Sequence, residues 1–301
     1  MFTKEEVPEL IKENRLWFGK NGRSKPSIKR FITEVQKGIV PTTWWPHTDA
    51  GHNDIAKKEI KSLFPEDLPF DTPKPLRLIQ RMVDLATDSE DKHIVLDFFA
   101  GSGTTGHAIV NNNNTDDGNR QFILVQLPEK TNNDSYPHIS DICTERTRRA
   151  IKKIKGENTG TGNIDLGFKV FKLDASNFTL WDADRATDAG ALEEQLKLYA
   201  DHIKPERSKQ DLLYEILLKS GLPLTAPIET VEVEGLTLHD VNNGELLVCL
   251  DDEVTSDRLR AMAARKPRQV ICLDAAFRNN DELKTNTVLE MKAGDIVFHT
   301  V

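Results

Sequence analysis

The spacing of apolar residues predicts alternating strands and helices in the first half of the chain. Residues 94–99 form an apolar run that only Asp97 interrupts, and a glycine turn follows before a new apolar stretch at 108–110. This order predicts a strand, a tight turn and a helix. Two further strands are predicted from a run at 122–127, apolar except for Gln126, and from an alternating segment at 167–174.

Two helices are predicted around these strands from apolar residues spaced three and four positions apart. The first follows Pro75, which suits a helix start because its missing N–H costs nothing there. Its apolar side consists of Leu76, Ile79, Met82, Val83 and Ala86. The second has its apolar residues between 139 and 154 and carries Arg146, Arg148, Arg149, Lys152, Lys153 and Lys155. We interpret it as a helix with a solvated basic face.

The pattern shifts after residue 185 and predicts a second, smaller α/β domain at 186–301. Helices are expected at 191–203, 210–219, 256–264 and 281–289, and strands at 230–238, 246–250, 269–273 and 295–299. This part of the sequence has no nucleophile–base pair and no glycine loop. We therefore expect it to serve docking, dimerisation or contact with a partner subunit.

The N-terminal region mixes short helical patterns with loops. Its histidines, His47 and His52, belong to a metal-binding residue type, but their spacing matches neither a helical i, i+4 pair nor a zinc finger. We therefore expect no metal site. Asn53 or Asp54 is better interpreted as the N-cap of the helix that follows.

Composition is typical of a folded chain without a membrane span. Apolar residues make up 38% of the 301 positions, no apolar run approaches 18 residues, and the first residues do not form a signal peptide. We therefore expect a cytoplasmic protein. The three scattered cysteines, Cys143, Cys249 and Cys272, are expected to be buried thiols.

The net charge of −8 is unevenly distributed. Residues 11–37 carry eight basic side chains against two acidic ones, a net charge of +6 that leaves −14 for the remainder. Trp17, Phe18 and Phe31 lie between these basic residues, an arrangement typical of nucleic-acid-binding surfaces. The alternative is a solvated basic face.

The glycine turn has the chemistry of a cofactor loop, because glycines let the backbone approach a ligand and the following helix offers unpaired N–H groups. Gly101, Gly103 and Gly106 formally match the dinucleotide fingerprint G-x-G-x-x-G, whereas a P-loop is excluded because no lysine follows. Asp97 would repel a pyrophosphate and suits a cationic ligand. S-adenosylmethionine, with an α-amino group and a sulfonium, is such a ligand.

The glycine turn also resembles motif I of amino-methylating DNA methyltransferases of the permuted β order, usually D-P-F-x-G-S-G-T-T. Here it reads Asp97-Phe98-Phe99-Ala100-Gly101-Ser102-Gly103-Thr104-Thr105, with Phe98 in place of the proline. That family carries a T-x-K-P motif, motif X, shortly before motif I, and this chain has Thr72-Pro73-Lys74-Pro75, with 23 residues from Lys74 to Asp97. Segments 121–129, 285–289 and 298–301 resemble the modification (Mod) subunit of type III restriction-modification systems, so the resemblance covers nearly the whole chain.

The resemblance implies a partial Rossmann-like S-adenosylmethionine-binding methyltransferase core at 71–185, preceded by the tail of a target-recognition or linker region at 1–70. The residues implied in cofactor binding are Thr72, Lys74, Pro75, Asp97, Phe98, Ala100, Gly101, Ser102, Gly103, Thr104, Thr105 and Gln126. Asp97 would bind the α-amino group and Gln126 the ribose, while Asp174 would approach the adenine ring. Helix capping by the T-P-K-P segment and turn capping by Asp174 are the alternatives. A nicotinamide oxidoreductase is disfavoured because it needs an acid where Gln126 stands.

The acceptor site of this enzyme class is missing from the sequence. Such enzymes hold the base amino group with Asp-Pro-Pro-Tyr and stack the flipped base on the tyrosine. No D-P-P-[YFW] occurs here, and the near match Asp67-Leu68-Pro69-Phe70 lies directly before motif X, where a turn is the simpler interpretation. We therefore name no catalytic residue.

The sequence as a whole predicts the C-terminal part of a DNA adenine-N6 methyltransferase of the Mod type, with S-adenosylmethionine as its cofactor. Double-stranded DNA would be bound through the full-length enzyme or a complementing chain. A homodimer or a restriction-subunit partner is expected, and no membrane. The alternative is a catalytically silent module for cofactor binding or subunit docking.

Overall fold

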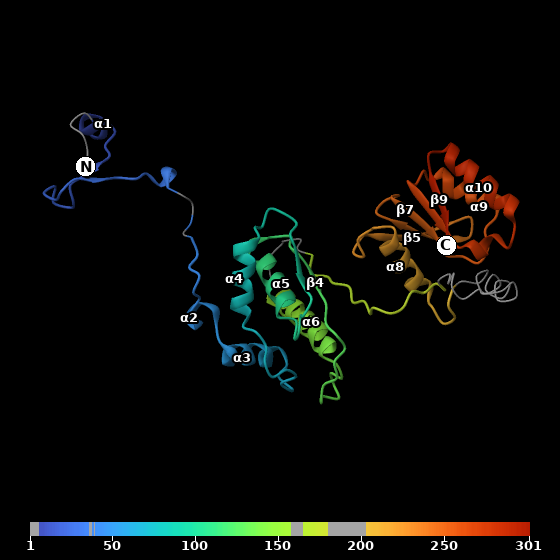
Figure 1. The fold of residues 1–301 in the computed structure, drawn as a ribbon, viewed down its shortest axis with the longest axis horizontal. Coiled ribbons are helices and arrows are strands. Elements are labelled where there is room, and N and C mark those ends of the chain that lie inside the picture. The colour runs from blue at the N-terminus through green and yellow to red at the C-terminus, as the bar shows by residue number, and fades with distance from the viewer. Residues whose placement is uncertain (1–5, 36–37, 39, 158–164, 180–202) are drawn as a thin grey trace, which may run out of the picture. The chain divides into compact units, whose positions relative to one another are not determined.

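The computed structural model describes residues 6–35, 38, 40–157, 165–179 and 203–301 (Figure 1). The chain divides into two compact units, Met1–Gly167 and Phe168–Val301. Both units mix helices and strands, so the predicted α/β class is confirmed. Among the described residues, no helix combines the length and the apolar character that a membrane span requires.

The first unit begins with short elements: α1 (Glu6–Lys12), β1 (Leu16–Trp17) paired antiparallel with β2 (Ser27–Ile28), η1 (Ile32–Glu34), α2 (His47–Ala50) and α3 (Asn53–Leu63). The predicted N-cap of α3 was wrong. The helix already begins at Asn53, and the N-cap is the extended residue His52, whose side chain makes no capping bond. Asp54 instead lies in the first turn, where its charge complements the helix dipole.

The centre of the first unit is a βαβ unit. Its elements are β3 (Ile94–Asp97), α5 (Thr104–Asp116) and β4 (Gln121–Leu124), and it is flanked by α4 (Leu76–Ala86) and α6 (Ile139–Glu157). β3 and β4 are parallel, with Asp97 opposite Leu124, and α5 crosses between them and packs against both α4 and α6 (Figure 1). The predicted order of strand, turn, helix and strand is confirmed, and Pro75 is the N-cap of α4 as expected.

Among the described residues, helices cover only one face of this sheet. α5 is buried along most of its length, with Ala108 and Ile109 fully inaccessible. The exposed fractions of Ile94, Leu96 and Ile123 are 62%, 56% and 51%, so alternate residues of both strands face outward. The prediction of a buried strand at 122–127 was therefore wrong for the outward-facing residues, because no described helix packs on their side.

The strand predicted at 167–174 is also absent from the structure. Residues 167–174 are not assigned to any strand, and the exposed fractions of Val170 and Leu173 are 61% and 96%. An alternating pattern marks a strand only where a neighbour supplies the ladder of hydrogen bonds.

The second unit contains a five-stranded mixed sheet with helices. Its elements are α8 (Lys209–Lys219), β5 (Ile228–Val233), β6 (Leu236–Val241), β7 (Leu246–Cys249), α9 (Ser256–Ala264), β8 (Gln269–Cys272), η2 (Asp274–Phe277), α10 (Asp281–Ala293) and β9 (Val297–Thr300). The strand order is β5-β6-β7-β8-β9, antiparallel from β5 to β7 and parallel from β7 to β9. The parallel half is built from β–α–β crossovers through α9 and α10, as parallel pairing requires.

Most predicted elements of the second unit are confirmed. The prediction of one continuous strand at 230–238 was wrong. The chain turns at Glu234 and Gly235, which have φ angles of +49° and +75°, so this segment belongs to the hairpin of β5 and β6. The helix expected at 191–203 falls almost entirely on residues 180–202, outside the described part of the chain.

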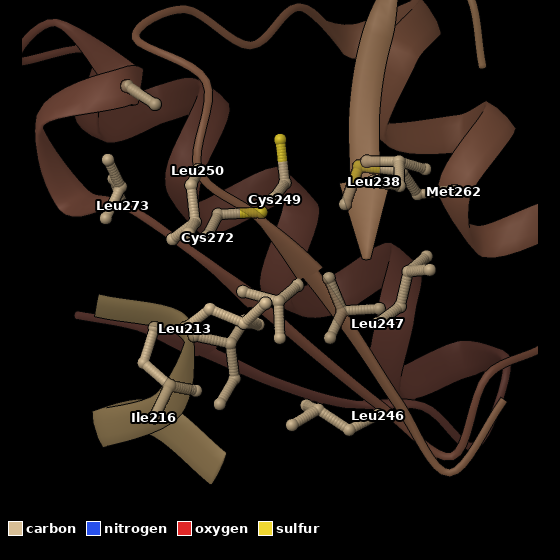
Figure 2. Close-up of a cluster of buried hydrophobic side chains, with 14 of the residues drawn as sticks. Leu213, Ile216, Leu238, Leu246, Leu247, Cys249, Leu250, Met262, Cys272 and Leu273 are labelled. Carbon is tan, nitrogen blue, oxygen red and sulfur yellow. The ribbon is translucent and has the colours of Figure 1, made fainter. Parts of the chain in front are cut away.

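The core of the second unit surrounds β7, whose four residues are all buried (Figure 2). Leu213 and Ile216 of α8 and Met262 of α9 pack into the same cluster. Cys249 and Cys272 are opposite each other on β7 and β8, and both are free and buried, as Cys143 is. The prediction of buried thiols is therefore confirmed.

Candidate functional site: the loop between β3 and α5

The loop at 98–103 connects the end of β3 to the start of α5. Its backbone is fixed by three bonds: Ala100 N–H donates to the Val125 carbonyl at 3.2 Å, Gly103 N–H donates to the Ala100 carbonyl at 2.8 Å, and Gly101 N–H donates to Gln126 Oε1 at 2.7 Å. The loop is therefore built against the end of β4, where the chain continues as residues 125–126.

Asp97 organises this loop from the end of β3. Its Oδ2 accepts a hydrogen bond from the Thr105 hydroxyl at 2.5 Å, and its Oδ1 accepts one from the Phe99 N–H at 3.2 Å. A carboxylate oxygen has two lone pairs, so each retains one for a ligand. Burial, followed by the charge of Asp97, raises the pKa of the nearby Cys143 thiol to about 11, which leaves that thiol protonated and unreactive at neutral pH.

The three glycines of the G-x-G-x-x-G match have different roles. A Cβ at Gly103 would lie 2.8 Å from the Cys143 carbonyl, and one at Gly106 would lie 2.9 Å from Leu124 Cδ1. These two glycines let α5 pack closely against α6 and β4. At Gly101 the nearest atom would be Phe70 Cζ at 3.8 Å, an ordinary van der Waals distance, so a Cβ would fit there without displacing a neighbour. Of the three glycines, Gly101 is thus the one that helix packing does not require.

The T-P-K-P segment lies against the glycine loop. The Thr104 hydroxyl, at the start of α5, donates to the Lys74 carbonyl over a long 3.5 Å. Pro75 begins α4, and the next residue, Leu76, donates its N–H to the Glu59 carboxylate at 2.9 Å. Thr72 and Lys74 are exposed. The structure thus brings together two motifs that the sequence separates by 23 residues.

One charged residue of the site was missed by sequence reasoning. Arg146 of α6 is fully buried, and its Nη1 donates to Ser102 Oγ at 2.9 Å and to Thr104 Oγ1 at 2.7 Å. Burial lowers its pKa to about 10, so it stays charged at neutral pH. The prediction of a solvated basic face was wrong at this position. The available signal was spacing, since Arg146 lies four residues from both Ile142 and Ala150 on the buried stripe of α6.

Comparison with known proteins identifies the chain's relatives. The profile of the N6_N4_Mtase family, described as DNA methylase, matches residues 1–154, which is just over half of the chain. The chain belongs to this DNA methylase family.

The methylase is also similar to modification subunits of type III restriction-modification enzymes. It is 30% identical to the StyLTI Mod subunit of Salmonella typhimurium, over 86% of this chain and 43% of that protein. It is 31% identical to the EcoP15I Mod subunit of Escherichia coli, over 97% of this chain and 44% of that protein. It is 28% identical to the EcoPI Mod subunit of Escherichia phage P1, over 91% of this chain and 42% of that protein. The chain thus spans less than half the length of these relatives, and the resemblance to Mod subunits is confirmed.

The other residues expected at the cofactor site surround the same loop. Phe98 is exposed, with its ring centroid 5.1 Å from that of Phe99, whereas Ala100 and Ser102 are buried. Gln126 donates from Nε2 to the Leu127 carbonyl at 3.3 Å in addition to accepting from Gly101. Gln126 therefore has a structural task in this methylase, because its side chain bonds both the glycine loop and the Leu127 carbonyl.

Asp67 and Asp174 are two acidic residues that lie near turns. Asp67 accepts from the Leu68 N–H at 2.7 Å and from Asn133 Nδ2 at 2.6 Å, which supports the turn interpretation of its segment. Asp174 belongs to the second unit, accepts from the Ala175 N–H at 2.7 Å and pairs with Arg207 at 3.2 Å. These contacts are those of turn capping.

The basic N-terminal segment forms a small ion-paired hairpin. Arg15 pairs with Glu34 and, at 2.7 Å, with Glu13, and these carboxylates raise its pKa. Trp17 and Phe31 are 51% and 42% exposed. The basic residues of the segment other than Arg15 are Lys12, Lys20, Arg23, Lys25, Lys29, Arg30 and Lys37.

The two N-terminal histidines are close together, with ring centroids 5.8 Å apart. Within the described residues, a different group has its carboxylate and imidazole atoms close enough together to hold one ion. It consists of Asp88, Asp91 and His93. In this turn before β3, the Asp88 carboxylate already accepts the backbone N–H groups of Glu90 and Asp91.

Proposed function

We propose that the chain carries the S-adenosylmethionine half-site of a DNA adenine-N6 methyltransferase that acts as a type III modification subunit, on a partial Rossmann-like core. The observation that carries this proposal is the contact between Thr104 and Lys74, because it joins motif X to motif I at one loop. The family membership and the similarity to Mod subunits support the same function.

The loop fits the cofactor chemically. The methionine end of S-adenosylmethionine carries a cationic α-amino group and sulfonium, which suit the remaining lone pairs of Asp97. Its carboxylate suits the N-terminus of α5, whose first N–H groups have no intrahelical acceptor. Gly101, which has no Cβ and is not needed for helix packing, would let the backbone come close to the ligand. When bound, the cofactor supplies the methyl group, while the residues of this chain bind and orient it.

Charge neutralisation at Asp97 tests the cofactor assignment. In a calorimetric titration of the chain with S-adenosylmethionine, Asp97→Asn should weaken binding about tenfold or more, since one charge-assisted bond is worth about 1.5–3 kcal/mol. The new amide oxygen can still accept a hydrogen bond from within the loop, so the loop should keep its shape. The matched control is Asp91→Asn, in the exposed turn before β3, which should bind like the wild type. Equal affinity of both variants would contradict the assignment.

DNA is proposed to reach this site through additional polypeptide. The chain has no Asp-Pro-Pro-Tyr segment to hold the target amino group, and the basic residues of segment 11–37 are proposed to face the DNA phosphates. A second chain that supplies the acceptor motif, a second copy or a restriction subunit is the expected partner. Methyl transfer from radiolabelled S-adenosylmethionine to DNA adenine, with and without a co-expressed chain bearing Asp-Pro-Pro-Tyr, tests this arrangement.

A silent module is the second candidate, and the missing acceptor motif is the observation that favours it. Such a module would bind S-adenosylmethionine in the titration above but transfer no methyl group in the presence of any co-expressed chain. Transfer that depends on the added chain would exclude it.

A further inference from the structure

We propose that Arg146 is the positioning residue of the cofactor loop: its buried guanidinium fixes the Ser102 and Thr104 hydroxyls in the geometry that receives S-adenosylmethionine. This inference rests on the proposed function and adds a residue that no motif of the sequence contains. Arg146 does not touch the ligand itself, because its side chain is fully buried.

The burial of Arg146 is costly, and packing alone does not explain it. Among the described residues, its Nε and Nη2 are buried without a hydrogen-bond partner, while Nη1 makes both bonds to the loop. An unpaired buried charge is strongly unfavourable, and an apolar side chain on the same stripe of α6 would avoid the cost. The two contacts that the arginine does make are both to motif I.

These contacts set the direction of a chain of hydrogen bonds. Since an arginine only donates, Ser102 and Thr104 must accept from it and point their own protons elsewhere. The Thr104 proton is directed to the Lys74 carbonyl of motif X. Within the described part of the chain, no protein acceptor takes the Ser102 proton, so the bond from Arg146 is the side-chain contact that fixes this hydroxyl.

A carboxylate near Arg146 favours the charged form of its guanidinium. Glu59 of α3 raises the pKa of Arg146 against the larger lowering by burial, so the guanidinium stays charged at neutral pH. The same carboxylate accepts the Leu76 N–H at the start of α4. Glu59 thus supports the segment that begins with motif X, while Arg146 supports motif I.

The test compares two arginines on one helix. Arg149, three positions after Arg146, bonds Glu145 at 2.7 Å, Tyr136 Oη at 2.9 Å and the Leu63 carbonyl at 2.8 Å, and none of these partners belongs to the loop. In a calorimetric titration with S-adenosylmethionine, Arg146→Met should weaken binding at least tenfold. Arg149→Met should lower the melting temperature yet leave the dissociation constant unchanged. Equal loss of affinity in the two variants would mean a general packing role and would overturn the proposal.

A double-mutant cycle keeps the proposal testable if Arg146→Met does not fold. Arg146→Lys, which retains the charge but lacks the planar guanidinium, is combined with Ser102→Ala. If the arginine acts through Ser102, the two losses of affinity should be non-additive. The dissociation constant of the double variant should then be at least threefold lower than the value obtained by multiplying the two single effects. Additive losses would overturn the inference. Failure of the wild-type chain to bind S-adenosylmethionine would instead refute the proposed function, and this inference with it.

Discussion

Replacing Gly101 and Gly103 with alanine, one at a time, separates helix packing from the proposed access of a ligand to the loop between β3 and α5. Gly101 and Gly103 both have positive φ, +52° and +78°, so alanine at either position costs about 1–2 kcal/mol in backbone strain. At Gly103 the new methyl would also lie 2.8 Å from the Cys143 carbonyl and 3.2 Å from its Cα. These are backbone atoms of α6, and the overpacking adds about 1–3 kcal/mol.

The two variants should therefore differ in stability. Gly103→Ala should destabilise the first unit by about 3 kcal/mol, equivalent to a fall of roughly 6–12 °C in its melting temperature, and Gly101→Ala by about half of that. Differential scanning calorimetry measures both shifts.

The order of the two variants should reverse for binding. Gly101→Ala places a methyl group on the open side of the loop, so it should weaken S-adenosylmethionine binding more than its modest instability suggests. Equal melting temperatures, or a larger loss of stability in Gly101→Ala, would refute the assignment of Gly103 to helix packing and Gly101 to ligand access.

Three further predictions test other parts of the molecule. Burial and, to a smaller extent, the charges of Arg146 and Lys153 lower the pKa of His107 to about 3. Between pH 3 and about 6.5 the unfolded state therefore binds more protons than the folded state. The first unit should be most stable above pH 6.5 and should lose up to about 2 kcal/mol of unfolding free energy by pH 5. Urea titrations at pH 7 and pH 5 should show a smaller difference in His107→Asn, and an unchanged difference would count against this origin. Leu238→Ala, at a fully buried position of β6, should cost about 2–5 kcal/mol in the thermal transition of the second unit and leave that of the first unaltered. Asn280→Ala removes the side-chain acceptor of the Leu283 N–H at the start of α10 and should cost about 1 kcal/mol by urea unfolding, whereas a neutral result would show that water replaces this cap.

Local patterns were sufficient wherever the structure depends on neighbours in the sequence. The run that ends at Asp97, the glycine turn and the following apolar stretch predicted β3, the loop and α5 correctly. Pro75 marked the start of α4, and residues 256–264 were recognised as α9. Each of these elements follows from backbone preferences and from the period of its own side chains. The pairing of T-P-K-P with motif I also came from the sequence, through a family resemblance.

Local patterns failed where the outcome depends on what packs alongside. The alternating segment at 167–174 is not a strand, and the run at 230–238 is interrupted by a turn with positive φ at 234 and 235. The period of apolar residues encodes neither which segments pair as strands nor where the hairpin of β5 and β6 turns.

The sequence by itself determined the α/β class, the position of the glycine loop and the family. The tertiary structure decided how the residues of that loop divide their tasks. Gly103 and Gly106 were interpreted as glycines that make room for a ligand. In the structure the space beside Gly103 is filled by Cys143, and the space beside Gly106 is filled by Leu124 and Thr147. Arg146 was interpreted as solvated, yet it is the buried cation beneath the loop. The reason is physical: a side chain's chemistry is local, but its burial and its hydrogen-bond partners are set by elements that lie far away in the sequence.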